Sequence, residues 1–300
     1  MKRLLKLLAF LVLPFVRALP SFDRQVPRVE RDVVYGTAGE TSLHLDLYRP
    51  RDESPSPLPC VVFLHGGGWW TGDKEDPPIK DMARRGFAVA SVEYRLSDTA
   101  HFPAALEDSK CAVRFLRANA ARYGIDPERI GVMGGSAGGH LALMVAFISS
   151  STGSGEAPES FEGTGGNPGV SSAVRCVCAW FPPTDFTLRL DGCKDEVERF
   201  LGASLEKDRA LHVRASPITH AKKEAPPVLL VHGDHDTDVP FEQSRVLQAR
   251  LEALGVPTEL VVVKNAEHSF YAVKGLPTPE PSPREILRLT EAFFARHLGP

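Results

Sequence analysis

A single serine stands among four glycines in the stretch VMGGSAGGH, residues 132–140. Gly134, Ser136 and Gly138 satisfy the pattern G-x-S-x-G, in which a sharp turn between a strand and a helix exposes a nucleophilic hydroxyl. Such a turn imposes unfavourable dihedrals on its central residue, and glycine neighbours relieve the crowding. The alternative is a glycine-rich loop that only joins a strand to a helix. The pattern favours Ser136 as a nucleophile.

A serine nucleophile needs a base, and the base needs an orienting carboxylate. The stretch NAEHSF follows an apolar run and presents His268 in a loop. The stretch HGDHDTDVP follows another apolar run and offers three carboxylates: Asp234, Asp236 and Asp238. Three close carboxylates could also hold a cation, but no EF-hand pattern follows them. One of the three is therefore expected to orient His268.

The reaction of a serine with a carbonyl also needs hydrogen-bond donors for the developing oxyanion. The stretch HGGGWW, residues 65–70, follows the apolar run 60–64. Its glycines allow backbone N–H groups to turn inward with no side chain in the way. We expect an oxyanion hole formed by the amides of Gly67, Gly68 and Ala137. The alternative is a plain glycine turn.

Two further features concern the substrate pocket. Trp69 and Trp70 are expected either to wall an acyl pocket or to cap the core beside the glycines. The segment 149–172 is rich in Ser and Gly, and we interpret it as a flexible excursion that is either a lid or an insertion without a role. The mixed, polar segment 184–225 is too short to predict a separate domain.

The elements that must position these groups follow from apolar patterning. The run 42–48, SLHLDLY, alternates between apolar and polar residues, as in an antiparallel strand with one solvent-exposed face. The later runs are continuously apolar, as in buried parallel strands. Helical patterns at 102–124, 241–255 and 283–298 lie between or after them. This alternation predicts an α/β fold with a mostly parallel eight-stranded sheet and helices on both faces. The eight expected strands are 31–36, 42–48, 60–66, 87–94, 129–135, 174–181, 228–233 and 259–265.

Composition narrows the function classes. The 300 residues are 43% hydrophobic and 24% charged, as in an ordinary globular protein. A net charge of -3 and a pI near 6.4 give no electrostatic reason to expect a nucleic-acid partner. The five cysteines include no C-x-x-C pair, so no zinc or redox site is expected. We expect most of them to be apolar core residues.

The N-terminus, MKRLLKLLAFLVLPFVRA, has a basic start followed by the apolar run 7–16. That run is about half the roughly 20 residues needed to span a bilayer. We interpret residues 1–18 as a signal peptide and 19–300 as the mature catalytic domain, secreted or periplasmic. The alternatives are an uncleaved segment that anchors the chain to a membrane and a short amphipathic helix on the domain.

Together these motifs resemble the α/β-hydrolase esterases, in particular the HGGG-bearing branch of hormone-sensitive-lipase-like carboxylesterases and BD-FAE-type, feruloyl-esterase-like enzymes. The order serine, aspartate, histidine is that of the α/β-hydrolase fold. In this family the acidic member lies in a G-x-x-D-x-x-V-P pattern, which Gly233, Asp236, Val239 and Pro240 match, so the resemblance selects Asp236. It covers residues 30–298 and rests on HGGGW, VEYRL, FPAALEDSKCAVRFLR, GIDPERIGVMGGSAGGHLA, PPVLLVHGDHDTDVP and NAEHSF.

The resemblance implies a serine carboxylesterase that works through an acyl-enzyme, without a metal or an organic cofactor. Lipase-like members carry a large N-terminal cap, whereas only about thirty residues precede the first expected strand here, which favours the BD-FAE-like branch and short acyl chains. Small-molecule esters and polysaccharide-linked acetyl or feruloyl esters remain candidates for the substrate. The alternatives are an amidase, an exopeptidase, an arylformamidase-like hydrolase, or a non-catalytic binding module. Tyr94, Arg95 and Asp108 are interpreted as structural residues behind the site, and the sequence does not determine the oligomeric state.

Overall fold

The computed structural model describes residues 26–52, 54, 56–148 and 161–299. The expected signal peptide lies outside the described residues, as does the part of the expected excursion before residue 161. Within the described ranges, no helix is both long enough and apolar enough to cross a membrane.

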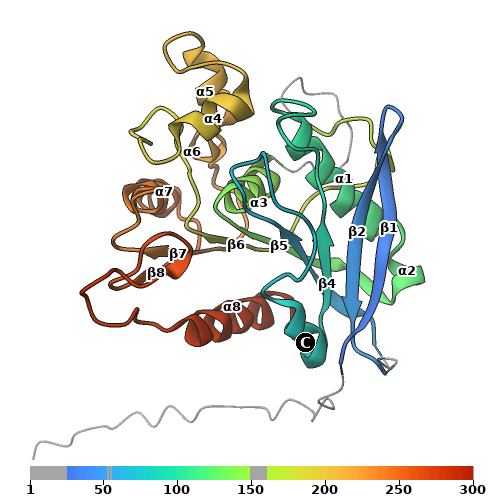
Figure 1. Ribbon diagram of the computed structural model, residues 1–300. Coiled ribbons are helices and arrows are strands. Elements are labelled where there is room, and N and C mark those ends of the chain that lie inside the picture. The colour runs from blue at the N-terminus through green and yellow to red at the C-terminus, as the bar shows by residue number, and fades with distance from the viewer. Residues whose placement is uncertain (1–25, 53, 55, 149–160, 300) are drawn as a thin grey trace, which may run out of the picture.

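One sheet of eight strands forms the centre of the molecule, in the order β1-β2-β4-β3-β5-β6-β7-β8 (Figure 1). The first two strands pair antiparallel, β2 pairs antiparallel with β4, and the remaining pairs are parallel. This confirms the mostly parallel eight-stranded sheet expected from the apolar runs. The strands are β1 (Arg28–Ala38), β2 (Thr41–Arg49), β3 (Leu58–Leu64), β4 (Ala88–Val92), β5 (Ile125–Gly135), β6 (Val177–Trp180), β7 (Val228–Gly233) and β8 (Thr258–Val263).

Helices cover both faces of the sheet because successive strand residues point to opposite sides. On β3, Val62 and Leu64 join the core beneath α1, α3 and α7, whereas Val61 and Phe63 join the core beneath η1 and α8. Figure 1 shows α3 and α8 on opposite sides of the strands. The helices are η1 (Lys80–Arg85), α1 (Ala104–Ala118), α2 (Ala120–Tyr123), α3 (Ala137–Ile148), α4 (Lys194–Leu201), α5 (Arg209–Ala215), α6 (Pro217–His220), α7 (Glu242–Ala253), η2 (His268–Phe270) and α8 (Pro283–Leu298).

The polar segment 184–225 folds into three short helices, α4, α5 and α6, which stand above the sheet in Figure 1. Helix α4 presents Val197, Phe200 and Leu201 to the core, so its packing is apolar although the segment as a whole is mixed. The segment therefore extends the core on the α1 and α3 face of the sheet, and it carries α4 close to the strand ends that bear the expected site.

The described part of the expected excursion, residues 161–172, is held against α1. Glu162 is buried and forms ion pairs with Lys110 (2.8 Å) and Arg114 (2.6 Å), both from α1. Ser172 donates a hydrogen bond to the same carboxylate at 2.8 Å. A buried carboxylate requires such partners because its desolvation is costly. None of residues 161–172 lines the cavity that contains Ser136.

Candidate active site

Ser136 lies on the sharp turn between β5 and α3, with a φ of 55°, in the left-handed region. The residues two positions before and after it, Gly134 and Gly138, have no room for a side chain because the backbone approaches closely there. A Cβ on Gly138 would overlap the carbonyl oxygen of Leu64, and a Cβ on Gly134 would overlap the backbone of Gly138. The turn therefore has the strained geometry that the pattern G-x-S-x-G predicted, and it exposes the Ser136 hydroxyl to a cavity.

The structure brings Ser136, His268 and Asp236 together, although 132 residues separate the serine from the histidine. His268 Nε2 lies 3.0 Å from Ser136 Oγ, and His268 Nδ1 lies 2.8 Å from Asp236 Oδ2. A carboxylate at Nδ1 fixes the tautomer in which Nδ1 carries the proton and Nε2 is free to accept one. The three side chains thus form one continuous chain of hydrogen bonds.

The Asp236 carboxyl is buried, which by itself would raise its pKa, but hydrogen bonds and charges from His232 and His268 outweigh burial and lower the pKa to about 2. Its Oδ1 atom also accepts hydrogen bonds from the backbone N–H groups of Asp238 (3.0 Å) and Val239 (2.8 Å). The carboxylate is therefore ionised at neutral pH and rigidly held.

Asp234, by contrast, contacts Asn265 and His235 and not His268. Its Oδ1 atom accepts the amide of Asn265 (2.8 Å) and lies 2.7 Å from His235 Nδ1. The structure thus places Asp236, and neither Asp234 nor Asp238, against His268.

His232 is a residue of the site that sequence reasoning missed. It is fully buried at the end of β7, with Nε2 3.3 Å from Asp236 Oδ2 and 2.8 Å from the Val239 carbonyl oxygen. Its Nδ1 atom lies 2.7 Å from Ser244 Oγ on α7. The available signal was its position four residues before Asp236 in HGDHD. His232 and His268 therefore both contact Oδ2 of Asp236.

The glycine loop after β3 lines the same cavity as Ser136. Gly67 and Gly68 have φ values of 105° and 57°, which L-residues rarely adopt. Among the described residues, neither amide N–H has a hydrogen-bond acceptor, so both remain available to an oxyanion in the cavity. Ala137 follows Ser136 directly as the first residue of α3, and its side chain is buried.

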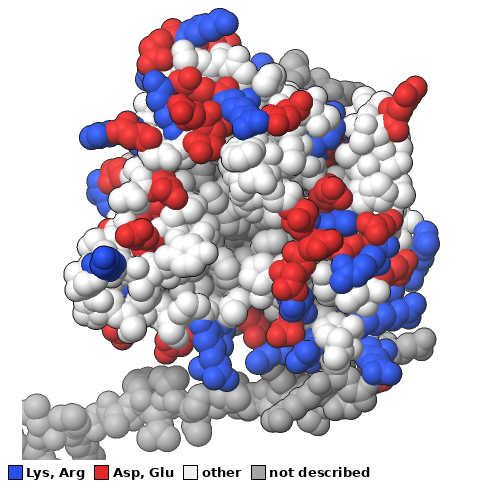
Figure 2. Space-filling model, viewed as in Figure 1, with Lys and Arg blue, Asp and Glu red and all other residues white. Residues whose placement is uncertain are grey.

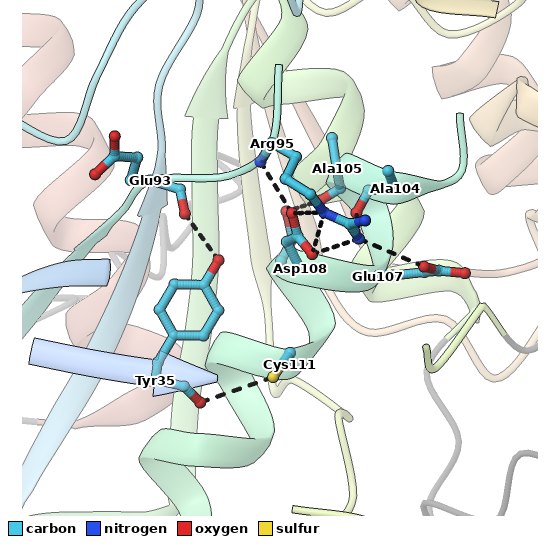
Figure 3. A network of polar contacts seen from close by, with 9 residues as sticks. Tyr35, Glu93, Arg95, Ala104, Ala105, Glu107, Asp108 and Cys111 are labelled. Carbon is cyan, nitrogen blue, oxygen red and sulfur yellow. Dashed lines mark hydrogen bonds and ion pairs between the residues drawn. The ribbon is translucent and has the colours of Figure 1, made fainter. Parts of the chain in front are cut away.

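The loop after β4 holds this glycine loop in place. The Tyr94 hydroxyl donates to the His65 carbonyl oxygen at 2.8 Å, and the two rings stack at 4.2 Å. The next residue, Arg95, makes a two-pronged contact with Asp108 of α1 through Nε (2.8 Å) and Nη2 (2.7 Å), as Figure 3 shows. Figure 3 also shows the Tyr35 hydroxyl bonded to the Glu93 carbonyl oxygen. These groups lie behind the cavity and not within it.

The two adjacent tryptophans have different environments. Trp69 is 2% exposed, stacks on Phe200 of α4 at 4.7 Å and donates its indole N–H to His140 Nδ1 of α3 at 3.2 Å. Trp69 caps the core and does not line the cavity. The expectation that it walls the acyl pocket is therefore wrong. Trp70 is 41% exposed and lines the cavity, with the Arg199 guanidinium 4.6 Å from its ring centroid.

The cavity has a volume of about 690 Å³, and the hollow in the face shown in Figure 2 lies between acidic side chains. Its walls are aromatic near the histidine, where the ring of Phe181 lies 4.6 Å from that of His268. Such a size and apolar lining suit a small organic ligand. Besides the residues already named, the lining includes Phe63, Thr71, Pro78, Trp180, Gly192, Cys193, Glu196, Ser269 and Phe270.

Within the described residues, no group of three or more His, Cys, Asp and Glu side chains is arranged to hold a metal ion. The five cysteines are all free, and four of them are buried as expected: Cys60, Cys111, Cys176 and Cys178. The fifth, Cys193, is half-buried at the cavity.

Comparisons with known proteins find esterases among the relatives of this chain. The BD-FAE family model matches residues 45–251. The esterase LipQ of Mycobacterium tuberculosis is 30% identical over 262 residues, which cover 84% of this chain and 60% of LipQ. The carboxylesterase NlhH of the same species is 30% identical over 292 residues, covering 89% of this chain and 84% of NlhH. This chain therefore spans about three fifths of LipQ and most of NlhH.

A solved structure, described as a truncated form of a carbohydrate esterase from gut microbiota, superposes with a TM-score of 0.74 at 26% identity. The match covers 91% of this chain and 97% of that chain. The likeness therefore extends over the whole sheet and its helices, and not only over the strand ends that carry the site.

Proposed function

Because this chain belongs to the BD-FAE family of α/β-hydrolases, we propose that it is a serine carboxylesterase. The observation that carries the proposal is the hydrogen-bonded chain from Ser136 through His268 to Asp236, beside two glycine amides that have no acceptor in the described part of the chain. The esterase names of its relatives support the same reaction class.

In the proposed reaction, His268 Nε2 accepts the Ser136 proton while Oγ attacks the ester carbonyl carbon. Asp236 stabilises the imidazolium that forms. The amides of Gly67, Gly68 and Ala137 donate to the oxyanion, and the loss of one such donor typically costs about a hundredfold in rate. The carbon–oxygen bond to the alcohol then breaks, and His268 gives its proton to the leaving alcohol.

The second half of the reaction uses the same groups. A water molecule gives a proton to His268 Nε2 and attacks the carbonyl carbon of the acyl-serine. The tetrahedral intermediate collapses, Ser136 Oγ regains its proton from His268, and the acid leaves. The Ser136 proton leaves with the alcohol and a proton from water replaces it, so the protein ends the cycle as it began.

We propose short-chain esters as substrates, including acetyl or feruloyl esters carried by carbohydrates. The carbohydrate esterase among the structural neighbours supports this choice, as does the half-exposed Trp70 ring at the cavity. An aromatic ring of this kind can pack against a sugar ring while the acyl group reaches Ser136.

The test combines labelling with hydrolysis. A fluorophosphonate probe should label Ser136 in the wild-type protein and fail to label a Ser136→Ala variant. Rates on p-nitrophenyl acetate, p-nitroacetanilide, acetylated xylan and methyl ferulate then separate esterase from amidase activity and rank the candidate substrates. Absence of both labelling and ester hydrolysis would overturn the proposal in favour of a binding module.

A further inference from the structure

The charges that line the cavity are of one sign. Two carboxylates, those of Glu196 and Asp238, belong to the lining, and no lysine or arginine among the described residues does. The catalytic mechanism proposed above uses neither of them. Both lie in the cavity that contains Ser136, so they can interact with a bound ester.

Glu196 lies in the first turn of α4, and Asp238 lies in the loop between β7 and α7. Two glycines allow these segments to approach the site. A Cβ on Gly192 would overlap the backbone of Thr237, so the segment before α4 packs directly on the loop of Asp238. A Cβ on Gly68 would lie 2.9 Å from Glu196 Cγ, which places this side chain against the glycine loop.

The carboxylates of Glu196 and Asp238 both act on the pKa of the Cys193 thiol. Burial raises the pKa of Cys193 to about 12, and the carboxylates of Glu196, Asp236 and Asp238 add to the increase. One thiol at the cavity therefore experiences both lining carboxylates together with the aspartate that holds His268.

Neither lining carboxylate is neutralised. Among the residues that the structure describes, no cation lies within ion-pair distance of Glu196 or Asp238, and neither side chain has a hydrogen-bond partner. The neighbouring cations of α4 are engaged elsewhere. Lys194 lies 3.5 Å from Glu198, and Arg199 binds Asp98 while covering the face of Trp70.

A purely structural role accounts for only part of this arrangement. An acidic side chain in the first turn of a helix is favourable because it interacts with the helix dipole, and this applies to Glu196. Asp195 occupies the same first turn and is exposed outside the cavity, so it shares that role. Asp238 is in a loop, and its side chain makes no hydrogen bond within the described residues.

We propose that Glu196 and Asp238 determine charge specificity, so that the cavity accepts neutral and cationic esters and rejects esters that carry a carboxylate on the alcohol. This inference rests on the proposed esterase function. Asp238 lies two residues from Asp236, the residue that binds His268, and it lines the same cavity as Ser136 and His268. Two like charges in a partly enclosed cavity repel a third more strongly than they would in open water.

The negative charges of Glu196 and Asp238 also affect the release of the acid product. Hydrolysis converts a neutral ester into a carboxylate, and unpaired carboxylates at the cavity favour its departure. Hydroxyl groups on a neutral alcohol, by contrast, can donate to Glu196 and Asp238, because ionised carboxylates are strong acceptors. A polyhydroxylated alcohol therefore fits this wall better than an acidic one.

The experiment uses three butyrate esters whose alcohols are similar in size and shape and differ in charge. Their alcohols are choline, which is cationic, 3,3-dimethylbutanol, which is neutral, and 4-hydroxy-2,2-dimethylbutanoate, which is anionic. At low ionic strength the wild-type kcat/KM should fall in that order, by about tenfold at each step when two exposed carboxylates act together. Added salt should reduce both steps because it screens charges at the cavity mouth.

Isosteric variants assign the effect to residues. Glu196→Gln and Asp238→Asn should each reduce the cationic-to-neutral ratio about threefold, and the double variant should bring it close to one. The matched control is Asp195→Asn, which removes the same charge from the same helical turn outside the cavity and should leave the ratio unchanged. Because the measured quantity is a ratio within one variant, a change in folding or overall activity does not alter its meaning.

The outcomes separate the two proposals. Equal kcat/KM for the three esters, or an equal loss of preference in Asp195→Asn, overturns the charge specificity and leaves the esterase function intact. Failure of the wild-type protein to hydrolyse any of the three, together with an unlabelled Ser136, overturns both.

Discussion

The two sides of the cavity are built in different ways. Around Ser136, backbone segments approach so closely that Gly134 and Gly138 have no room for a side chain, and the acid that holds His268 is buried. Around Glu196 and Asp238, side chains are partly or fully exposed and have no partners among the described residues. In the proposed reaction the first side performs the chemistry, and we expect the second side to tolerate a change of charge with little effect on the fold. If both proposals hold, different residues determine the reaction and its charge specificity.

The largest expected effect comes from removing the nucleophile. Ser136→Ala should lower kcat for p-nitrophenyl acetate by about 10⁶-fold, as in other serine hydrolases in which the triad acts as a unit. Thermal unfolding should be almost unchanged, because the variant keeps the Cβ and removes only an oxygen at the cavity. Retention of more than a few per cent of the wild-type rate would place the nucleophile elsewhere.

The next effect distinguishes the three aspartates of one loop. Asp236→Asn should lower kcat by about 10⁴-fold, because the amide favours the wrong tautomer of His268. Asp234→Asn and Asp238→Asn should lose far less on the same neutral ester, since neither side chain contacts His268. If Asp238→Asn proved the most damaged of the three, the separation between the two sides of the cavity would be wrong.

The folding stability of the protein should decrease at low pH because of His140, which is buried on α3 behind Ser136. His140 is fully buried, and burial lowers its pKa to about 4, because the charged form would lose its solvation. Between pH 6.5 and pH 4 the unfolded chain therefore binds a proton that the folded chain does not, and stability falls as the pH falls. The loss amounts to at most about 3 kcal/mol of unfolding free energy.

Urea unfolding followed at pH 7 and at pH 4.5 measures this loss. His140→Gln, which cannot be protonated, should show a smaller difference between the two pH values than the wild-type protein. An identical difference would assign the acid sensitivity to other groups, such as His65, whose pKa burial also lowers.

The smallest effect concerns the length of the acyl chain. We expect kcat/KM for p-nitrophenyl esters to peak between acetate and butyrate and to decline beyond about six carbons. Methylenes that extend past the cavity into water gain none of the roughly 0.8 kcal/mol that burial of each would provide. A profile that still rises at decanoate would show that a longer apolar channel continues from the cavity.

The pattern of apolar residues predicted most of the strands and the longer helices. It did not predict the break in one helix or the presence of short helices. Continuous apolar runs identified the parallel strands, because strands buried on both faces have no wet side. The expected helix 102–124 is instead divided into α1 and α2 at Asn119, since an apolar stripe does not specify a local break. The helices of the segment 184–225 were not predicted, because short helices carry too few turns to show a periodicity.

The sequence by itself determined the residues of the tightly packed side, because each belongs to a local motif directly after a buried strand. Parallel strands end at one edge of the sheet, so Ser136, Asp236 and His268 had to converge there. Only the tertiary structure decided between the adjacent residues Trp69 and Trp70, because Phe200 and His140 arrive from distant helices and enclose the first alone. Tertiary packing likewise brought Glu196 to the cavity, since no local pattern encodes where an irregular segment docks.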